Sequence, residues 1–210
     1  MSIPQAHQPE QTDRESAATR VCGECSLCCT VLRVDELGKL GGEPCPQLRD
    51  AAKGCAIYEQ RPRICRAYRC MWLRGYLEER DRPDRLGAIV ELLPVGTGLR
   101  LSIHEATPGA YDRSDRLQKL AASHRETIPV RIADVVDVEN PDRPYRVLLA
   151  RGEEQRVTGD RTTQYRDGVR VGERRLPWLD RAARRLQIRL RTLRLRVARR
   201  RSAPAGRGPR

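Results

Sequence analysis

The sequence predicts an α+β fold, and three observations lead to this prediction. All eight cysteines of the 210-residue chain lie between Cys22 and Cys70. The following stretch alternates apolar and polar residues between glycine-containing turns, a pattern typical of β-strands. The chain then continues with leucines at helical spacing among many arginines. The expected order is a small cysteine-rich domain, an extension of a β-hairpin and short strands, and a C-terminal basic amphipathic helix.

Residues 1–20 are polar, show no hydrophobic periodicity, and are expected to form a disordered arm. They lack the apolar core of a secretory signal. No stretch of the chain approaches the roughly 20 apolar residues that a membrane-spanning helix needs. The sequence therefore predicts a cytoplasmic protein, in which crowded thiols serve metal binding or redox chemistry rather than a disulfide framework.

The cysteine-cluster domain is expected over residues 21–75 and begins with CGECSLCC, four thiols within eight residues. Two cysteines separated by two residues can turn both sulfurs onto one cation, and zinc prefers about four such ligands in a tetrahedron. A chain without Phe builds a modest apolar core, so we expect a metal staple to help this domain fold. The expected metal ligands are Cys22, Cys25, Cys28, Cys29, Cys45, Cys55, Cys65 and Cys70.

Cys28 and Cys29 are adjacent, and adjacent side chains point about 100° apart on a helix. We therefore expect their sulfurs to diverge, with at most one of them joining the group that contains Cys22 and Cys25. The other sulfur would then belong to a second metal or to a polynuclear cluster, or would have a separate role.

Arginines are interspersed among the last three cysteines, and Arg61 and Arg66 are candidates for a place behind the metal ligands. A thiolate-rich site is negatively charged, and guanidinium groups can offset that charge while hydrogen-bonding the sulfurs. Solvent exposure is the alternative for each of them. Three states of the thiols stay open: zinc or mononuclear iron, a 4Fe-4S cluster, and metal-free thiols.

The cysteine pattern resembles a known family. CxxCxxCC at 22–29, Cys45 followed by Pro46, and CAIYEQRPRICRAYRCMW at 55–72 are similar to the bacterial CxxCxxCC cysteine-cluster family (YkgJ-type), described as a zinc- or iron-chelating domain. RPDRLGAIVELL and HEATPGA resemble the continuation in some members. The resemblance implies metal chelation by these cysteines and no settled activity. A similar cluster in the flagellin lysine methylase is associated with an iron–sulfur centre, which keeps a 4Fe-4S cluster as the alternative.

Residues 76–173 are expected to form the α+β extension. LGAIVELL and LRLSIHEA predict two strands around the turn PVGTG, and DRSDRLQKLAASH predicts a capped helix. IPVRIADVVDV and YRVLLARG predict further strands, and Asp167-Gly168 predicts a hairpin turn. Glu105 follows Leu101 and Ile103 on one strand face and is the single candidate catalytic residue, with an exposed strand end as the alternative. Whether the protein is an enzyme stays open, because no nucleophile, base and orienting group can be assembled.

The tail, residues 174–210, holds 14 of the 41 basic residues and a single acid, Asp180, whereas the rest of the chain is balanced. We expect one helix from Pro177 to about Arg201. Three partners stay open for it: its own domain or a second copy, the phosphates of nucleic acid bound non-specifically, and an anionic membrane. Its apolar residues form a narrow seam of Leu179, Ala183, Leu186, Leu190, Leu193 and Val197.

The favoured function is a cytoplasmic zinc- or iron-binding module that serves metal handling, regulation or structure. The first alternative is an iron–sulfur-cluster enzyme in redox chemistry or protein modification, which the lack of a catalytic set disfavours. The second is a nucleic-acid-associated protein with a structural metal site. The balanced charge of residues 1–173 disfavours this second alternative.

Overall fold

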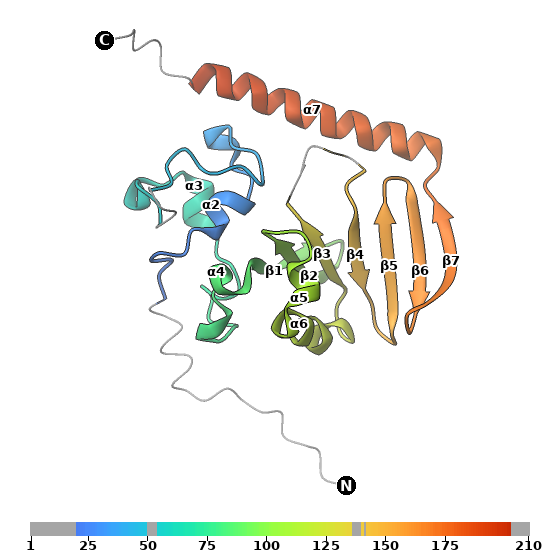
Figure 1. The fold of residues 1–210 in the computed structure, drawn as a ribbon. Helices are drawn as coiled ribbons and strands as arrows, with labels where there is room; N and C mark the ends of the chain where they lie inside the picture. The colour runs from blue at the N-terminus through green and yellow to red at the C-terminus, as the bar shows by residue number, and fades with distance from the viewer. Residues whose placement is uncertain (1–19, 50–53, 136–139, 141, 203–210) are drawn as a thin grey trace.

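The computed structural model describes residues 20–49, 54–135, 140 and 142–202 (Figure 1). The predicted disordered arm, residues 1–20, lies outside the described residues apart from Arg20. Arg20 donates hydrogen bonds to the carbonyl oxygens of Trp72 at 2.9 Å and Leu77 at 2.6 Å. The described chain therefore starts at a residue that is anchored on the folded part.

The fold is α+β with a C-terminal helix, as predicted, but its sheet is larger than the predicted hairpin and short strands. Seven strands form one mixed sheet, and their spatial order follows the chain. Neighbouring strands are antiparallel except β2 and β3, which are parallel. The strands are β1 (Ala88–Val95), β2 (Gly98–Glu105), β3 (Val130–Asp134), β4 (Tyr145–Leu148), β5 (Glu153–Thr158), β6 (Arg161–Arg166) and β7 (Val169–Arg175).

Short helices lie at the β1–β3 side of the sheet, and one long helix ends the described chain (Figure 1). The parallel strands β2 and β3 need a crossover, and α5 and α6 supply it along one face of the sheet (Figure 1). The helical segments are α2 (Leu27–Val31), η1 (Asp35–Leu37), η3 (Tyr58–Gln60), α3 (Arg63–Ala67), η4 (Glu79–Asp81), α4 (Pro83–Leu86), α5 (Ala110–Arg113), α6 (Asp115–Arg125) and α7 (Trp178–Ser202).

Local sequence signals are confirmed at three places. The β1–β2 hairpin turns at Gly96, which has a φ of 58°. Asp167 and Gly168 have φ values of 50° and 80° and join β6 to β7, as the Asp-Gly signal predicts. The Ser114 hydroxyl accepts the Leu117 N–H at 3.2 Å and caps the start of α6.

The outer strands β5 and β6 explain why the sheet exceeds the prediction. Their sequences, EEQRVT and RTTQYR, are polar on both faces, and within them Val157 alone is fully buried. Backbone pairing from Glu153 opposite Arg166 to Thr158 opposite Arg161 holds the two strands together. A pattern of apolar residues cannot reveal strands that bury so little apolar surface.

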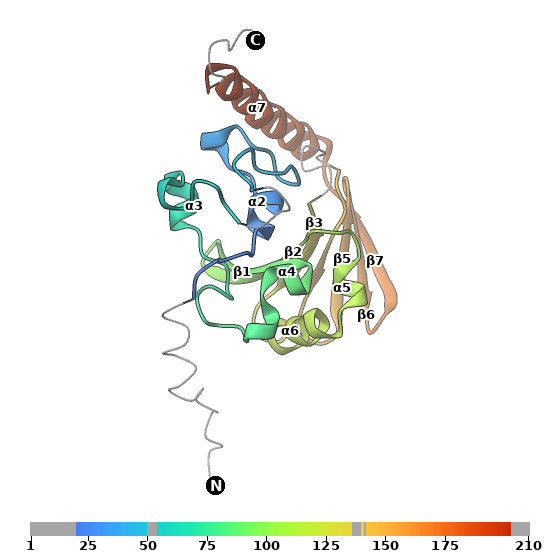
Figure 2. The same ribbon diagram turned by 60° about the vertical axis from the view of Figure 1, so that its left-hand side comes forward.

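Strand β1 is buried on both of its faces. Ala88 and Val90 pack with Leu117 of α6 in the larger apolar cluster. Ile89, whose side chain points the other way, packs with Val31 of α2 in a second cluster. The cysteine-rich region and α6 therefore lie on opposite faces of the sheet (Figure 2).

Helix α7 is one continuous helix, in agreement with the prediction for residues 177–201. Near its start, Arg181 forms an ion pair with Asp160 at 2.9 Å. Further along, the helix passes over the cysteine-rich region (Figures 1 and 2). There Arg33 donates a hydrogen bond to the carbonyl oxygen of Arg191 at 3.3 Å.

The predicted seam of α7 faces solvent. Leu179, Leu186 and Leu193 are 61%, 58% and 58% exposed. The helix thus docks on its own chain through a different stripe, and the seam is left open to a partner. The half-buried stripe consists of Arg181, Arg184, Ile188 and Thr192.

We expect Leu101→Ala to lower the free energy of unfolding by about 2–5 kcal/mol, because it removes a fully buried side chain from the larger apolar cluster. Leu99→Ala, on the same strand at a position 51% exposed, should change it by less than about 1 kcal/mol. Urea unfolding followed by circular dichroism measures both. Equal losses for the two variants would show that α6 and the sheet do not form the stabilising core.

Candidate metal centre

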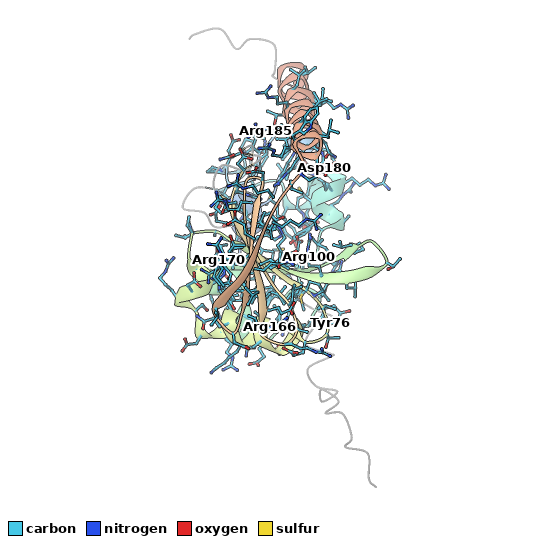
Figure 3. The ribbon with its side chains drawn as sticks, turned by 90° about the vertical axis from the view of Figure 1, so that its right-hand side faces the viewer. Tyr76, Arg100, Arg166, Arg170, Asp180 and Arg185 are labelled. Atoms are coloured by element: carbon cyan, nitrogen blue, oxygen red, sulfur yellow. The ribbon has the colours of Figure 1, made fainter. Side chains whose placement is uncertain are left out.

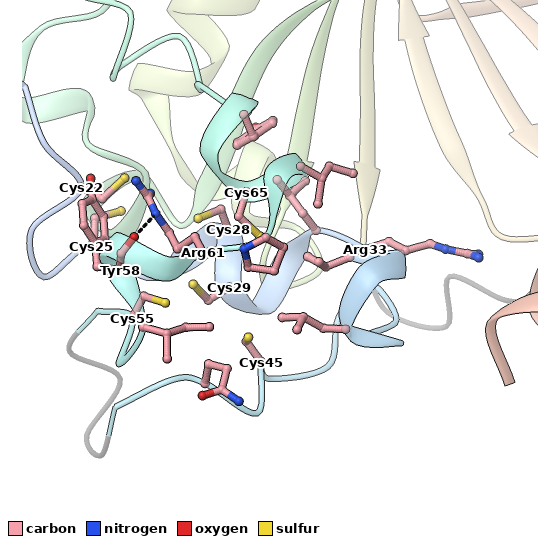
Figure 4. Close-up of a pocket in the computed structure, with 18 of the residues that line it drawn as sticks. Cys22, Cys25, Cys28, Cys29, Arg33, Cys45, Cys55, Tyr58, Arg61 and Cys65 are labelled. Carbon is pink, nitrogen blue, oxygen red and sulfur yellow. Dashed lines mark hydrogen bonds between the residues drawn. The ribbon is translucent and has the colours of Figure 1, made fainter. Parts of the chain in front are cut away.

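One cavity of about 320 Å³ gathers seven of the eight cysteines (Figure 4). The eighth, Cys70, does not line it and packs against the apolar clusters on both faces of β1. The structure thus brings together all the expected metal ligands except Cys70. The seven are Cys22, Cys25, Cys28, Cys29, Cys45, Cys55 and Cys65.

A tight turn sets the first two thiols. The Cys25 N–H donates to the Cys22 carbonyl oxygen at 2.8 Å, and Gly23 between them has a φ of 54°. Gly54 brings a second segment close to this turn, because a Cβ at Gly54 would lie only 2.9 Å from the Gly23 carbonyl oxygen. Cys55 is thereby placed beside Cys22 and Cys25.

A buried lysine fixes the loop that leads to Cys45. Lys39 is 1% exposed. Its ammonium group donates to the carbonyl oxygens of Leu40 at 2.9 Å, Thr30 at 3.0 Å and Leu32. Carbonyl groups at the end of a helix lack helical partners, so this ammonium satisfies the end of α2. It also places a positive charge close to the thiols.

The carboxylate of Glu36, in η1, caps the helix α3 that carries Cys65. It accepts the backbone N–H groups of Arg63 at 3.1 Å and Ile64 at 3.0 Å. A negative group is favourable at a helix start, where N–H groups are unpaired. The contact joins the first cysteine segment to the last one.

The two arginines expected behind the ligands occupy different places. Arg61 lines the cavity, its guanidinium lies 3.6 Å over the ring of Tyr58, and its Nε donates to the Tyr58 carbonyl oxygen at 2.7 Å (Figure 4). Arg66 is exposed on α3 and does not line the cavity. Arg33 lines the cavity and was not anticipated from the sequence. Its side chain extends away from the thiols, toward α7.

Cys28 and Cys29 both line the cavity, and an interaction between their thiols couples their ionisation. The expectation that at most one of the two sulfurs joins the group of Cys22 and Cys25 stays a prediction. The thiol interaction raises the pKa of Cys28, and burial raises it further. For Cys29 the same interaction, with the charges of Lys39 and Arg61, outweighs burial and lowers the pKa to about 7.

Burial dominates at the other shifted thiols of the cavity. It raises the pKa of Cys25 to about 11, and it also raises the pKa values of Cys45 and Cys65. These groups therefore carry protons at neutral pH in the metal-free protein. Because thiolate is the metal-binding form, binding would release those protons.

The donor set fits a soft metal ion in chemistry, since thiolates are preferred ligands of zinc, iron and iron–sulfur clusters. Within residues 20–49, 54–135, 140 and 142–202, no three His, Cys, Asp or Glu side chains lie close enough together to hold a metal ion. The thiols therefore share one cavity without forming a finished coordination sphere.

Sequence reasoning missed the polar wall of the cavity. Glu91 of β1 lines it, and its carboxylate lies 2.7 Å from His104 Nε2. Burial acts to raise the pKa of Glu91, but the hydrogen bond and charge of His104 outweigh it and hold the pKa below its usual range. The available signal was the position of Glu91, which alternates with Ile89 and Leu93 on one face of an otherwise apolar strand.

Glu105, the candidate catalytic residue, is 7% exposed and does not line the cysteine cavity. Its carboxylate accepts the backbone N–H of Tyr111 at 2.7 Å, at the start of α5. This contact caps a short helix on the face of the sheet opposite the thiols. Glu105 thus holds the start of α5 and lies away from the other predicted site residues.

A scan of protein-family models, a search of curated proteins and a search of solved structures each match nothing to this chain. The likeness of its cysteine spacing to the bacterial cysteine-cluster family therefore stays a prediction. Its function has to be inferred from the cavity itself.

In the reduced, metal-free protein, we expect Cys29 to react with iodoacetamide faster than the other cavity cysteines at neutral pH. A pKa of about 7 leaves about half of this group as the reactive thiolate there. Mass spectrometry of the labelled peptides should show the rate at Cys29 rising through about pH 7 and levelling off above it.

Lys39→Gln should shift this rise to higher pH, because it removes a charge that stabilises the Cys29 thiolate. Lys119→Gln, at an exposed lysine of α6, is the matched control and should leave the profile unchanged. A native midpoint at or above about pH 8.5, the ordinary cysteine value, would contradict the thiol–thiolate pairing.

Proposed function

We propose that the cysteine cavity binds zinc or iron, and that the protein is a cytoplasmic metal-binding module for metal handling, regulation or structure. The observation that carries this proposal is the convergence of seven thiols on one cavity. They come from segments as far apart in the chain as Cys22 and Cys65. Crowded thiols that are not joined in disulfides favour metal ligation over a disulfide framework.

The residues of the cavity suit this role. Cys22, Cys25 and Cys55 lie at one end, and Cys28 and Cys29 supply an adjacent pair in which one thiol ionises readily. A bound zinc or iron ion would supply Lewis acidity or, for iron, electron transfer. The chain supplies the charge balance, since the buried ammonium of Lys39 and the guanidinium of Arg61 would offset the negative charge of the thiolates.

Two alternatives from other classes stay open. A cavity of about 320 Å³ is larger than one ion requires and lies in the size range of small-molecule sites, which favours a 4Fe-4S enzyme that also holds a substrate. Glu91, which His104 contacts, would then contribute a polar group to the wall of that site. A nucleic-acid-associated protein with a structural metal would instead use the basic tail.

Anaerobically purified protein should contain zinc or iron by elemental analysis, and its visible spectrum separates colourless zinc from a brown iron–sulfur cluster. Cys25→Ala with Cys28→Ala should abolish the metal and lower the melting temperature, because structural zinc can contribute an apparent ~10–16 kcal/mol. Cys70→Ala is the matched control and should keep the metal, since Cys70 lies outside the cavity. The proposal fails if the native protein contains no metal and chelators leave its melting temperature unchanged.

A second proposal concerns α7, which we infer binds an anionic lipid surface. Its exposed seam supplies apolar residues, while the helix carries arginines throughout and a single acid, Asp180. Pairing with a second copy would bring like charges together, and nucleic acid would leave the leucines uncovered. An anionic lipid surface can take both groups. Among the described residues, none of the helices combines the length and apolar character that crossing a bilayer requires.

Deletion of residues 177–210 should leave the metal content unchanged and abolish sedimentation with phosphatidylserine-containing vesicles. Leu186→Gln with Leu190→Gln should weaken vesicle binding while sparing retention on heparin, because it removes seam residues and no charge. Neutral phosphatidylcholine vesicles are the control for charge. Loss of heparin retention in the leucine variant, or unchanged vesicle binding after deletion, would argue for another partner.

A further inference from the structure

Several arginines meet on the face of the sheet that α6 does not cover. Arg131 of β3 is the central one, and its guanidinium lies 4.4 Å over the ring of Tyr145. Burial lowers the pKa of Arg131 to about 10, and the charges that lower it further are those of three other arginines. These are Arg143, which precedes β4, Arg100 of β2 and Arg184 of α7.

Arg100 and Arg131 lack the ion pairs that other arginines of the described chain form. On the other face of the same sheet, Arg146 pairs with Asp112 at 2.6 Å and with Glu154 at 3.0 Å. In the part of the chain that the structure describes, Arg100 and Arg131 form no ion pair. Placing like charges together in a partly buried position is unfavourable unless an anion joins them.

Buried polar atoms beside Arg131 also lack a partner. Ser102 is 1% exposed, and its hydroxyl has no hydrogen-bond partner in the described chain. Ser102 is paired with Arg131 across β2 and β3, so the two side chains share a face. On that face, two residues before Ser102, the buried Nε of Arg100 is also without an acceptor. Unsatisfied buried donors are rare, because each costs free energy that an acceptor would recover.

The donor side chains come from two parts of the fold, the sheet and α7. Arg184 donates to the Gly159 carbonyl oxygen at 3.3 Å, so α7 lies against the β5–β6 turn at this point. Figure 3 shows Arg100 on the sheet and Arg185, the neighbour of Arg184, on α7. The donors therefore come from the sheet on one side and from the helix on the other. Donors from two sides suit a small oxyanion.

We propose that Arg100, Ser102, Arg131 and Arg184 form a site for a phosphate-type oxyanion between the sheet and α7. Guanidinium groups match the geometry of phosphate oxygens, and a serine hydroxyl can donate to the same ligand. Such an anion neutralises the cluster and satisfies the buried donors. It also joins α7 to β2 and β3. The source is either free phosphate or the phosphate group of a small molecule.

The test measures the binding of inorganic phosphate to the full chain by calorimetry, with sodium chloride at equal ionic strength as the reference. Native protein should bind phosphate near 1:1 stoichiometry, and its melting temperature should rise with phosphate concentration. Arg131→Gln should weaken binding by about tenfold or more, because it removes a charge-assisted donor. Ser102→Ala, a small change that preserves the fold, should weaken binding severalfold.

Two arginines of one helix, the half-buried Arg184 and the exposed Arg189, give the matched comparison. Arg184→Gln should weaken phosphate binding, whereas Arg189→Gln, which removes the same charge at an exposed position of α7, should not. Tighter binding of a nucleoside monophosphate than of phosphate would identify a phosphorylated small molecule as the source, and equal binding would identify the free ion. Stabilisation no greater than that by chloride overturns the proposal, as do equal losses in the two arginine variants.

Discussion

The burial of β1 on both faces is the constraint on which the rest of the structure depends. One face joins the apolar cluster with α6, and the other joins the cluster with α2. The cysteine-rich region therefore packs against the sheet through Val31 and Ile89. Glu91 can line the thiol cavity because it lies on this second face. A change in the sheet that moved β1 would move the cavity wall with it.

Positively charged side chains lie in three different surroundings in this protein. Lys39 is enclosed by backbone carbonyls beside the thiols, where its charge favours ionisation of Cys29. Arg131 lies near other arginines and forms no ion pair within the described part of the chain. Exposed arginines of α7 flank an apolar seam. The same charge thus favours a thiolate in one place, and it would suit the proposed oxyanion in the second and the proposed anionic surface in the third.

Local sequence signals correctly predicted features that depend on a few neighbouring residues. Three such features are confirmed: the Asp167-Gly168 turn, the Ser114 cap and the helix that follows Pro177. The gathering of cysteines was anticipated from their number. The exception of Cys70 was not, because only packing distinguishes it from its neighbours.

Features that depend on contacts across the fold could not be predicted in this way. Strands β5 and β6 are polar and take their conformation from their neighbours. His104 contacts Glu91 behind the cavity wall, on a strand face that the sequence alone gives no reason to bury. The low pKa of Cys29 depends on the positions of Cys28, Lys39 and Arg61, which sequence spacing does not specify.

A sheet whose strands follow the chain in order has two open borders, and each is a potential template for aggregation. At β1, the backbone N–H of Met71 donates to Val90 at 3.0 Å, so the protein's own chain covers that border. At β7, Val169 and Val171 are exposed, but Arg170 lies between them and more arginines end the strand. A second copy adding its own β7 there would bring arginine against arginine. The arginines of this strand thus help to keep individual molecules from joining edge to edge.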